Sequence, residues 1–192
     1  MAKLHFKYGA MNSGKSDTLI KTAYNYGEQG LEVVTIKPSI DTKGDRLIVA
    51  RGGATRKVDI LATPDTNIRE AIKKLKIEKL HCVLVDESQF LTEEQIDQLY
   101  DVAKLDNISV IAYGLRADFR KQLFPGSKRL FEIVDNIEKL PTMCRCGAQA
   151  EFNCRLVGGK YVFEGSQVAI DGEGEVTYNS LCGNCYILER TS

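Results

Sequence analysis

The stretch Gly9-Ala10-Met11-Asn12-Ser13-Gly14-Lys15-Ser16 decides the fold, because it fits the phosphate-binding loop pattern G-x-x-x-x-G-K-[S/T]. A strand pattern at residues 3–8 precedes it, and helical spacing follows at residues 15–26. Glycines at both ends allow the backbone NH groups to face phosphate oxygens, while Lys15 reaches the β and γ phosphates and Ser16 can ligate Mg²⁺. The alternative is a glycine-bearing turn that matches by chance. The strand before and the helix after favour a nucleotide site, but they do not distinguish hydrolysis from transfer to an acceptor.

Composition narrows the class of protein. The 192 residues suffice for one sizeable core and a small appended module. Lysine plus arginine total 26, as do aspartate plus glutamate, so no overall field attracts nucleic acid. No run of about 18 apolar residues is present, and the first thirty residues hold the loop in place of a signal-peptide pattern. We therefore expect a soluble cytoplasmic protein with neither a membrane nor a nucleic acid as partner.

Strand and helix patterns alternate up to about residue 140, which is typical of a parallel α/β sheet flanked by helices. The predicted strands are residues 4–8, 32–37, 57–61, 81–85 and 109–113, and the predicted helices are residues 15–26, 67–75 and 92–105. After Pro141 the helical periodicity fades, and Gly158-Gly159 predicts a hairpin turn. These changes predict a nucleotide-binding domain at residues 1–140 and a small domain at residues 141–192.

Two acidic residues follow the strand predicted at residues 81–85. Magnesium that bridges two phosphates also needs a carboxylate at the end of a nearby strand, and Asp86 is placed to supply it. Glu87, the next residue, can take a proton from the group that attacks the γ-phosphate. An attacking water would make the protein an ATPase, and an attacking hydroxyl would make it a kinase, so these residues leave both classes open.

Four of the six cysteines form two close pairs in the last quarter of the chain, namely Cys144, Cys146, Cys182 and Cys185. Four thiolates suit a structural tetrahedral zinc site, although the first pair is spaced more tightly than is common. A redox disulfide between Cys182 and Cys185 would leave the first pair unexplained. A zinc ribbon that contacts nucleic acid would need a basic surface, and only Arg145 and Arg155 lie near the cysteines.

Three motifs taken together resemble the cytosolic-type (type II) thymidine kinases, most closely the bacterial members. They are Asp86-Glu87-Ser88-Gln89-Phe90, the run from Tyr113 to Arg120, and the cysteine pairs with Tyr178 before the second. The resemblance covers residues 4–186. It implies a RecA-like P-loop core with a C-terminal zinc-binding lasso domain, and transfer of the γ-phosphate of ATP to the 5′-hydroxyl of thymidine, and also of deoxyuridine, in nucleotide salvage. It further implies Mg²⁺ with ATP, structural Zn²⁺, a homotetramer and feedback inhibition by dTTP.

The same resemblance assigns roles to individual residues. Glu87 is the implied general base, and the implied ATP-binding residues are Gly9, Ala10, Met11, Asn12, Ser13, Gly14, Lys15, Ser16, Asp86, Glu87, Ser88 and Gln89. The implied magnesium-binding residues are Ser16, Asp86 and Asp41. The implied nucleoside-binding residues are Met11, Leu115, Phe119 and Tyr178. A lasso around residues 167–178 would close over the nucleoside. Ordinary core packing for Phe119, and a structural role for Tyr178, are the alternatives that these residue types also fit.

Two positions differ from the family pattern. Lys43 stands where family members carry an arginine that stabilises the transferring phosphate, and Arg46 or Arg51 is the alternative for that role. Asn153 is more polar than expected for a residue near the thymine methyl, which bears on base selection. Two other classes remain to be distinguished: a RecA-like ATPase stimulated by nucleic acid, and a zinc-ribbon binding protein with a vestigial loop.

Overall fold

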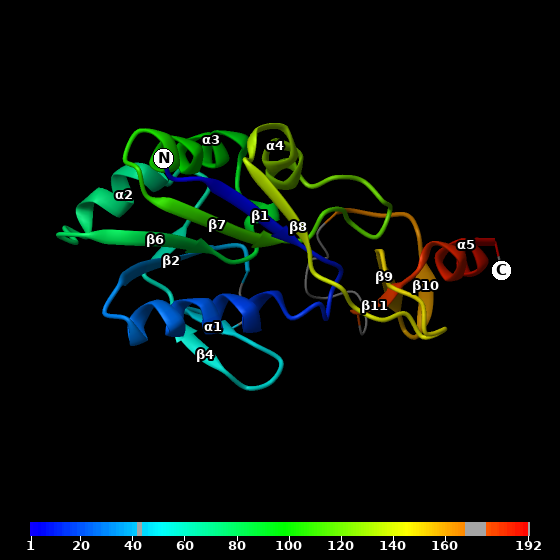
Figure 1. Ribbon diagram of the computed structural model, residues 1–192. Coiled ribbons are helices and arrows are strands. Elements are labelled where there is room, and N and C mark those ends of the chain that lie inside the picture. The colour runs from blue at the N-terminus through cyan, green and yellow to red at the C-terminus, as the bar shows by residue number, and fades with distance from the viewer. Residues whose placement is uncertain (42–43, 168–175, 192) are drawn as a thin grey trace.

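The computed structural model describes residues 1–41, 44–167 and 176–191 of the chain. Its central feature is a sheet of six parallel strands in the order β5-β2-β6-β7-β1-β8 (Figure 1). The strands are β1 (Leu4–Tyr8), β2 (Glu32–Pro38), β5 (Ile60–Ala62), β6 (Leu80–Val85), β7 (Ser109–Gly114) and β8 (Asn136–Lys139). The predicted α/β class is confirmed.

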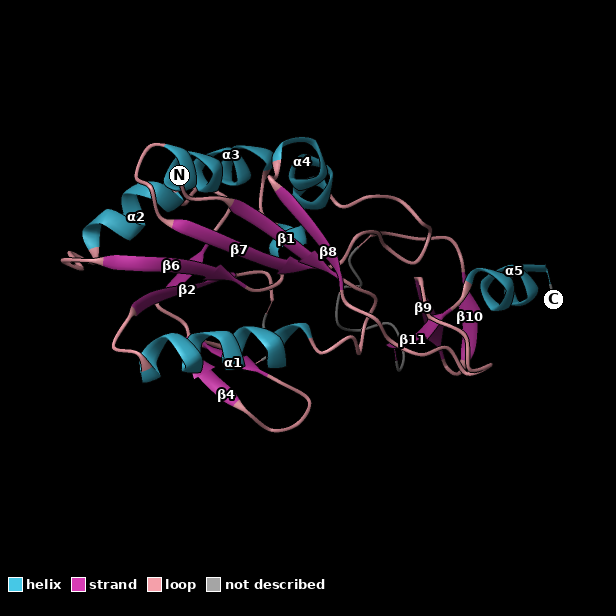
Figure 2. Cartoon of the chain, in the orientation of Figure 1, coloured by secondary structure: helices cyan, strands magenta, loops and turns pink. Residues whose placement is uncertain are grey.

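Helices cover both faces of this sheet (Figure 2). One face carries α2 (Ile68–Lys74), α3 (Glu93–Lys104) and α4 (Pro125–Ile133), and the other carries α1 (Lys15–Glu28) with the hairpin of β3 (Leu47–Val49) and β4 (Thr55–Lys57). The predicted start of α3 is confirmed, since Thr92 and Gln95 form a capping box. Helices on both faces leave the central strands β6 and β7 with little exposed side-chain surface.

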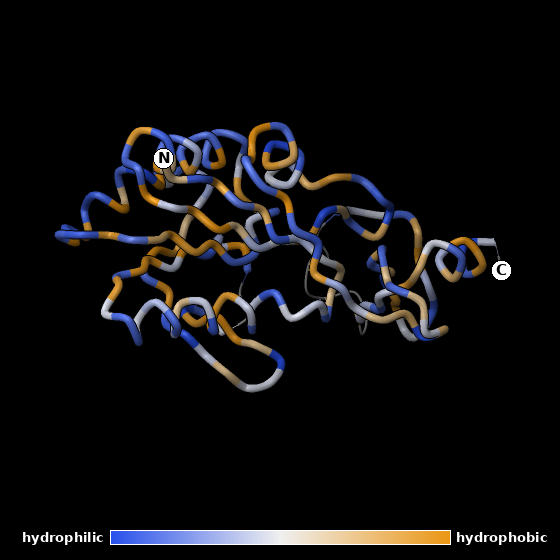
Figure 3. Tube along the Cα trace, in the orientation of Figure 1, coloured by the Kyte–Doolittle hydropathy of each residue, from blue (hydrophilic) through white to orange (hydrophobic). Residues whose placement is uncertain are grey.

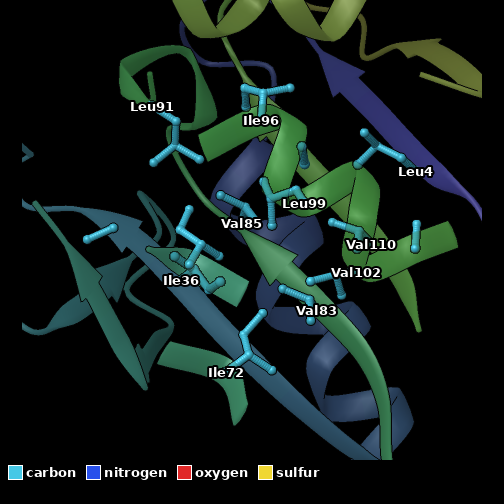
Figure 4. Close-up of a cluster of buried hydrophobic side chains, with 14 of the residues drawn as sticks. Leu4, Ile36, Ile72, Val83, Val85, Leu91, Ile96, Leu99, Val102 and Val110 are labelled. Carbon is cyan, nitrogen blue, oxygen red and sulfur yellow. The ribbon is translucent and has the colours of Figure 1, made fainter. Parts of the chain in front are cut away.

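The larger apolar core lies between the sheet and α2, α3 and α4. Figure 4 shows its side chains meeting from strands and helices, among them Leu4, Ile36, Ile72, Val83, Val85, Leu91, Ile96, Leu99, Val102 and Val110. A second cluster, which includes Leu19, Leu84 and Tyr113, packs between the sheet and α1. Figure 3 shows that hydrophobic residues occur along both the strands and the helices, interspersed with hydrophilic ones. The two cores hold the strand ends in fixed positions relative to one another.

A smaller sheet lies beyond the end of the large one. Its order is β10-β9-β11, all antiparallel, with β9 at Phe152–Val157, β10 at Lys160–Val162 and β11 at Val176–Leu181, followed by α5 at Gly183–Thr191. Gly158 and Gly159 both have positive φ, of 55° and 78°, in the turn between β9 and β10, so the predicted hairpin is confirmed. The division into domains at residue 140 stays a prediction.

Some predictions of local structure were wrong. The single strand predicted at residues 57–61 is divided between β4 and β5, because Asp59 accepts hydrogen bonds from the Thr35 NH and hydroxyl and turns the chain. The polar edge strand β8 and the helices α4 and α5 were not predicted. Within the described part of the chain, no helix is both long and apolar enough to cross a membrane.

Candidate active site

The phosphate loop joins the carboxyl end of β1 to the start of α1. Asn12 and Gly14 have φ angles of 70° and 72°, so the loop turns twice through the left-handed region. Gly9 is packed so closely that an added Cβ would lie 2.7 Å from the Leu140 carbonyl oxygen. The Lys15 ammonium is buried and donates hydrogen bonds to the carbonyls of Gly9 and Ala10, at 3.2 and 3.0 Å. Burial lowers the pKa of Lys15, and the charges of Glu87 and Asp86 oppose that shift.

Asp86 stands directly beside this loop, at the end of β6. The Ser16 hydroxyl donates to Asp86 Oδ2 at 3.0 Å. The other oxygen, Oδ1, is buried and accepts no hydrogen bond from any residue that the structure describes. Burial, and then the neighbouring Glu87, raise the pKa of Asp86 to about 7. A buried carboxylate with a free oxygen next to a loop hydroxyl offers the oxygen donors that a divalent cation such as Mg²⁺ prefers, so the residues fit this metal.

Glu87 is the second acidic residue at the end of β6, and it begins the tight turn at Ser88–Phe90. Its φ of 48° is unusual for a residue with a side chain, and such conformations persist where the surroundings fix them. Gln89 provides one restraint, because its amide donates to Glu87 Oε2 at 2.5 Å while its oxygen accepts from the Leu115 NH at 3.1 Å. Ser88 provides another through its hydroxyl, which donates to the Tyr113 carbonyl at 2.9 Å. The Glu87 carboxylate is thus held by the end of β7.

A cavity of about 380 Å³ lies between the phosphate loop and the turn that begins at Glu87. The described residues that line it include Met11, Lys15, Ser16, Asp41, Arg51, Glu87, Gln89 and Leu115. The Asp41 carboxylate forms an ion pair with the buried Lys37 at 3.0 Å. Of the three candidates for the phosphate-stabilising cation, Arg51 lines the cavity and Lys43 lies outside the described residues. Asp86, Phe119 and Tyr178 are absent from the described lining.

The four paired cysteines converge at one end of the small sheet. The sulfur atoms of Cys144, Cys146, Cys182 and Cys185 all lie within 4.8 Å of one another, and those of Cys146 and Cys182 are 3.6 Å apart. Tetrahedral zinc with Zn–S bonds of about 2.3 Å separates its sulfurs by about 3.8 Å, so the four thiols fit this ion. Gly147, with a φ of 88°, permits the tight turn after the first pair. All six cysteines are free, which disfavours the disulfide alternative.

Comparison with known proteins agrees with the geometry of the site. A family model described as thymidine kinase matches residues 2–186. The chain belongs to the thymidine kinase family. It is 43% identical over 185 residues to the thymidine kinase of Mannheimia succiniciproducens, covering 95% of this chain and 93% of that protein. The thymidine kinase of Enterobacteria phage T4 is 44% identical over 185 residues, with coverage of 95% and 94%. The resemblance predicted from the motifs is confirmed, and the RecA-like ATPase is not favoured.

Sequence reasoning missed Arg155, which organises the family's implied nucleoside residues. Its guanidinium is buried and lies 3.9 Å from the centre of the Phe119 ring. The same group donates to the Tyr178 hydroxyl at 2.9 Å and to the carbonyls of Ser166 and Gln167. Tyr178 lies opposite Arg155 in the register of β11 and β9. Arg155 therefore connects Phe119 and Tyr178, although no local sequence signal distinguishes it from a surface arginine.

Most of the implied lasso, residues 168–175, lies outside the described residues. Gln167, at its start, donates to Asp118 Oδ2 at 3.3 Å. Asp118 is buried and also accepts from the backbone NH groups of Arg120 and Gln122. The first residue of the implied lasso is thus connected to the segment that carries Phe119.

Proposed function

We propose that this protein transfers the γ-phosphate of ATP to the 5′-hydroxyl of thymidine, giving thymidine monophosphate, and that deoxyuridine is a second acceptor. One observation carries the proposal. The phosphate loop and the Glu87 carboxylate face a single cavity that continues to Met11 and Leu115. A nucleoside bound beside those two residues would bring its hydroxyl to the carboxylate and the donor phosphate together. Membership of the thymidine kinase family supports the same acceptor.

The proposed chemistry is chiefly positioning and charge stabilisation. Loop NH groups and Lys15 would hold the donor phosphates, and Glu87 would accept the proton of the attacking hydroxyl. Ser16, Asp86 and Asp41 would hold Mg²⁺, which neutralises charge on the transferring phosphate when bound. Arg51 takes the role of the cation beside that phosphate, because it lines the cavity.

For the nucleoside, we propose a pocket formed by Met11, Leu115, Phe119 and Tyr178. The Phe119 ring, fixed by Arg155 on one face, would pack against the base, and apolar side chains bury a flat base well. In this proposal residues 1–140 form the nucleotide-binding domain, and residues 141–192 form the zinc-stapled domain that closes over the nucleoside. A homotetramer in the cytoplasm, inhibited by dTTP, completes the proposal.

The decisive experiment is an assay of labelled phosphate transfer from ATP to each of the four deoxynucleosides. We expect product from thymidine and deoxyuridine, and turnover that depends on the nucleoside and not on single-stranded DNA. Glu87→Gln keeps the side chain's size and should lower the transfer rate by about 10²- to 10⁴-fold while ATP still binds. Transfer to neither nucleoside would refute the proposal. A near-normal rate in the Glu87 variant would remove only the assignment of the base.

A further inference from the structure

Three side chains from the C-terminal part of the chain form hydrogen bonds to consecutive peptide groups of the phosphate loop. Asn153 Oδ1 accepts from the Met11 NH at 2.7 Å. The Ser180 hydroxyl donates to the Met11 carbonyl at 2.6 Å, and the Thr142 hydroxyl donates to the Asn12 carbonyl at 3.2 Å. All three partners lie more than 120 residues away in sequence, so no local pattern indicates them.

Asn153 and Ser180 act from the same place on the small sheet. They are directly opposite one another in the register of β9 and β11, and both are buried. Both polar atoms of the Asn153 amide form hydrogen bonds, because its Oδ1 accepts from the Met11 NH and its Nδ2 donates to the Ala117 carbonyl at 3.3 Å. Asn153 therefore bridges the phosphate loop and the segment that leads to Phe119. This use of both amide atoms gives a physical reason for a polar residue at a position where an apolar one was expected.

The bonded peptide groups flank the least favourable backbone conformation of the loop. Asn12 has a φ of 70°, which a residue with a side chain adopts only at a cost. Such a conformation persists when surrounding contacts fix it. The hydrogen bonds to the Met11 and Asn12 carbonyls lie on either side of this residue, and the bond to the Met11 NH fixes the peptide before them.

We propose that Asn153 and Ser180 are positioning residues for ATP: they hold the backbone NH and carbonyl of Met11 so that the phosphate loop is already shaped for the nucleotide before the nucleoside binds. The inference rests on the proposed function only in taking this loop as the site of the donor phosphates. Because the two side chains belong to the small sheet, that sheet contributes to donor binding as well as to the acceptor pocket. Loss of either bond leaves the loop free to leave its strained conformation, and binding must then restore that conformation.

The test measures affinity for a non-hydrolysable ATP analogue with Mg²⁺ by calorimetry, with thymidine omitted. Ser180→Ala and Asn153→Ala should each raise the dissociation constant by about three- to tenfold, the effect of losing one hydrogen bond. Ser180→Thr keeps the hydroxyl and should restore an affinity close to that of the unmodified protein. The double alanine variant should lose less than the product of the single effects, since both bonds restrain the backbone of one residue, Met11.

Asn179→Ala is the matched control. Asn179 is the neighbour of Ser180 on β11, and its amide donates to the Tyr161 hydroxyl instead of the phosphate loop. We expect the affinity of the Asn179→Ala variant for the ATP analogue to remain within about twofold of that of the unmodified protein. If Asn153→Ala fails to fold, the alanine and threonine variants of Ser180 decide the question.

Equal affinity in Ser180→Ala and Ser180→Thr, both within about twofold of the unmodified protein, would overturn the proposal. Because the measurement contains no thymidine, its result is separate from the transfer assay. A protein that binds the analogue as expected and transfers nothing to thymidine would refute the proposed function alone.

Discussion

Gly126 lies in the first turn of α4 and packs against the turn at Ser88–Phe90, which follows Glu87. A substitution at Gly126 therefore tests whether α4 holds that turn in place. A Cβ added at Gly126 would lie 2.4 Å from the Ser88 carbonyl oxygen, 2.8 Å from that of Leu91 and 3.0 Å from that of Gln89. Real Cβ contacts are essentially never closer than 3.0 Å. All three neighbours are backbone atoms, so no change of rotamer can relieve the overlap. Gly126→Ala must therefore move α4 or the turn at Ser88–Phe90 by about 1 Å.

The size of the effect follows from that displacement. Forcing one methyl group into a packed site costs about 1–3 kcal/mol of unfolding free energy. A shift of about 1 Å at Ser88–Phe90 would also misplace the preceding Glu87, and misplacement of that size can lower a catalytic rate by about a hundredfold. We expect Gly126→Ala to lower kcat for thymidine by about ten- to a hundredfold and to leave ATP-analogue affinity within about threefold, because the three atoms nearest to the added Cβ belong to residues 88–91 and not to the phosphate loop.

Urea unfolding and steady-state kinetics measure the two effects. Gly27→Ala is the control, because Gly27 lies in α1 and no described atom beyond its chain neighbours and its own helix backbone comes within 4 Å of its added Cβ. Alanine there should raise the unfolding free energy by about 0.5–1 kcal/mol, since it favours the helix. If Gly126→Ala is as stable and as active as the Gly27 variant, the idea that α4 holds the turn at Ser88–Phe90 in place is wrong.

Three further predictions concern other parts of the site. Arg155→Lys keeps the charge but loses the planar guanidinium that contacts Tyr178 and two carbonyls, so the KM for thymidine should rise about tenfold or more. Arg145→Lys replaces an exposed arginine and should leave the KM for thymidine unchanged. Burial raises the pKa of Asp86 from 3.8 to about 7, so between these values the folded protein holds a proton that the unfolded chain releases. The unfolding free energy of nucleotide-free protein should therefore fall as the pH rises from about 4 to about 7. Urea titrations at about pH 5 and pH 8 should show a smaller fall in Asp86→Asn, and equal falls in both proteins would contradict the shift. Elemental analysis should find about one zinc per chain. Cys146→Ser should reduce the zinc content and lower the melting temperature by about 5 °C or more. If protein stripped of metal is as stable as untreated protein, the metal has no structural role.

The parts of the fold that could be predicted from sequence are those with a local chemical signature. The loop from Gly9 to Ser16 has a fixed spacing, and the strand before Asp86 is an apolar run that only a covered strand explains. The capping box at Thr92 and the glycine pair at Gly158 are similarly local. Each of these signals depends on residues within a few positions of one another, so periodicity and spacing were sufficient.

The missed elements depend on contacts that sequence spacing does not contain. β8 is polar and largely exposed, and it is a strand only because it pairs with β1 at the edge of the sheet. The start of α4 was overlooked although Pro125 at its first position is a recognised signal, because Pro-Gly also predicts a turn. Arg155 and Asn153 acquire their roles from partners far away in the chain, and neither residue type indicates them.

The small sheet connects these long-range contacts to the metal site. Among the described residues, seven buried ones form its core, and three of them, Cys144, Cys182 and Cys185, are also proposed zinc ligands. A core of that size stabilises little by burial alone, so a metal cross-link through the cysteines would contribute a large part of the order of the sheet. The same sheet carries Asn153 and Ser180 to the Met11 peptide and Arg155 to the Phe119 ring. In this proposal a metal held by the cysteines would order the sheet that contacts both the donor loop and the proposed acceptor pocket, and Met11 lies where the loop and the pocket meet.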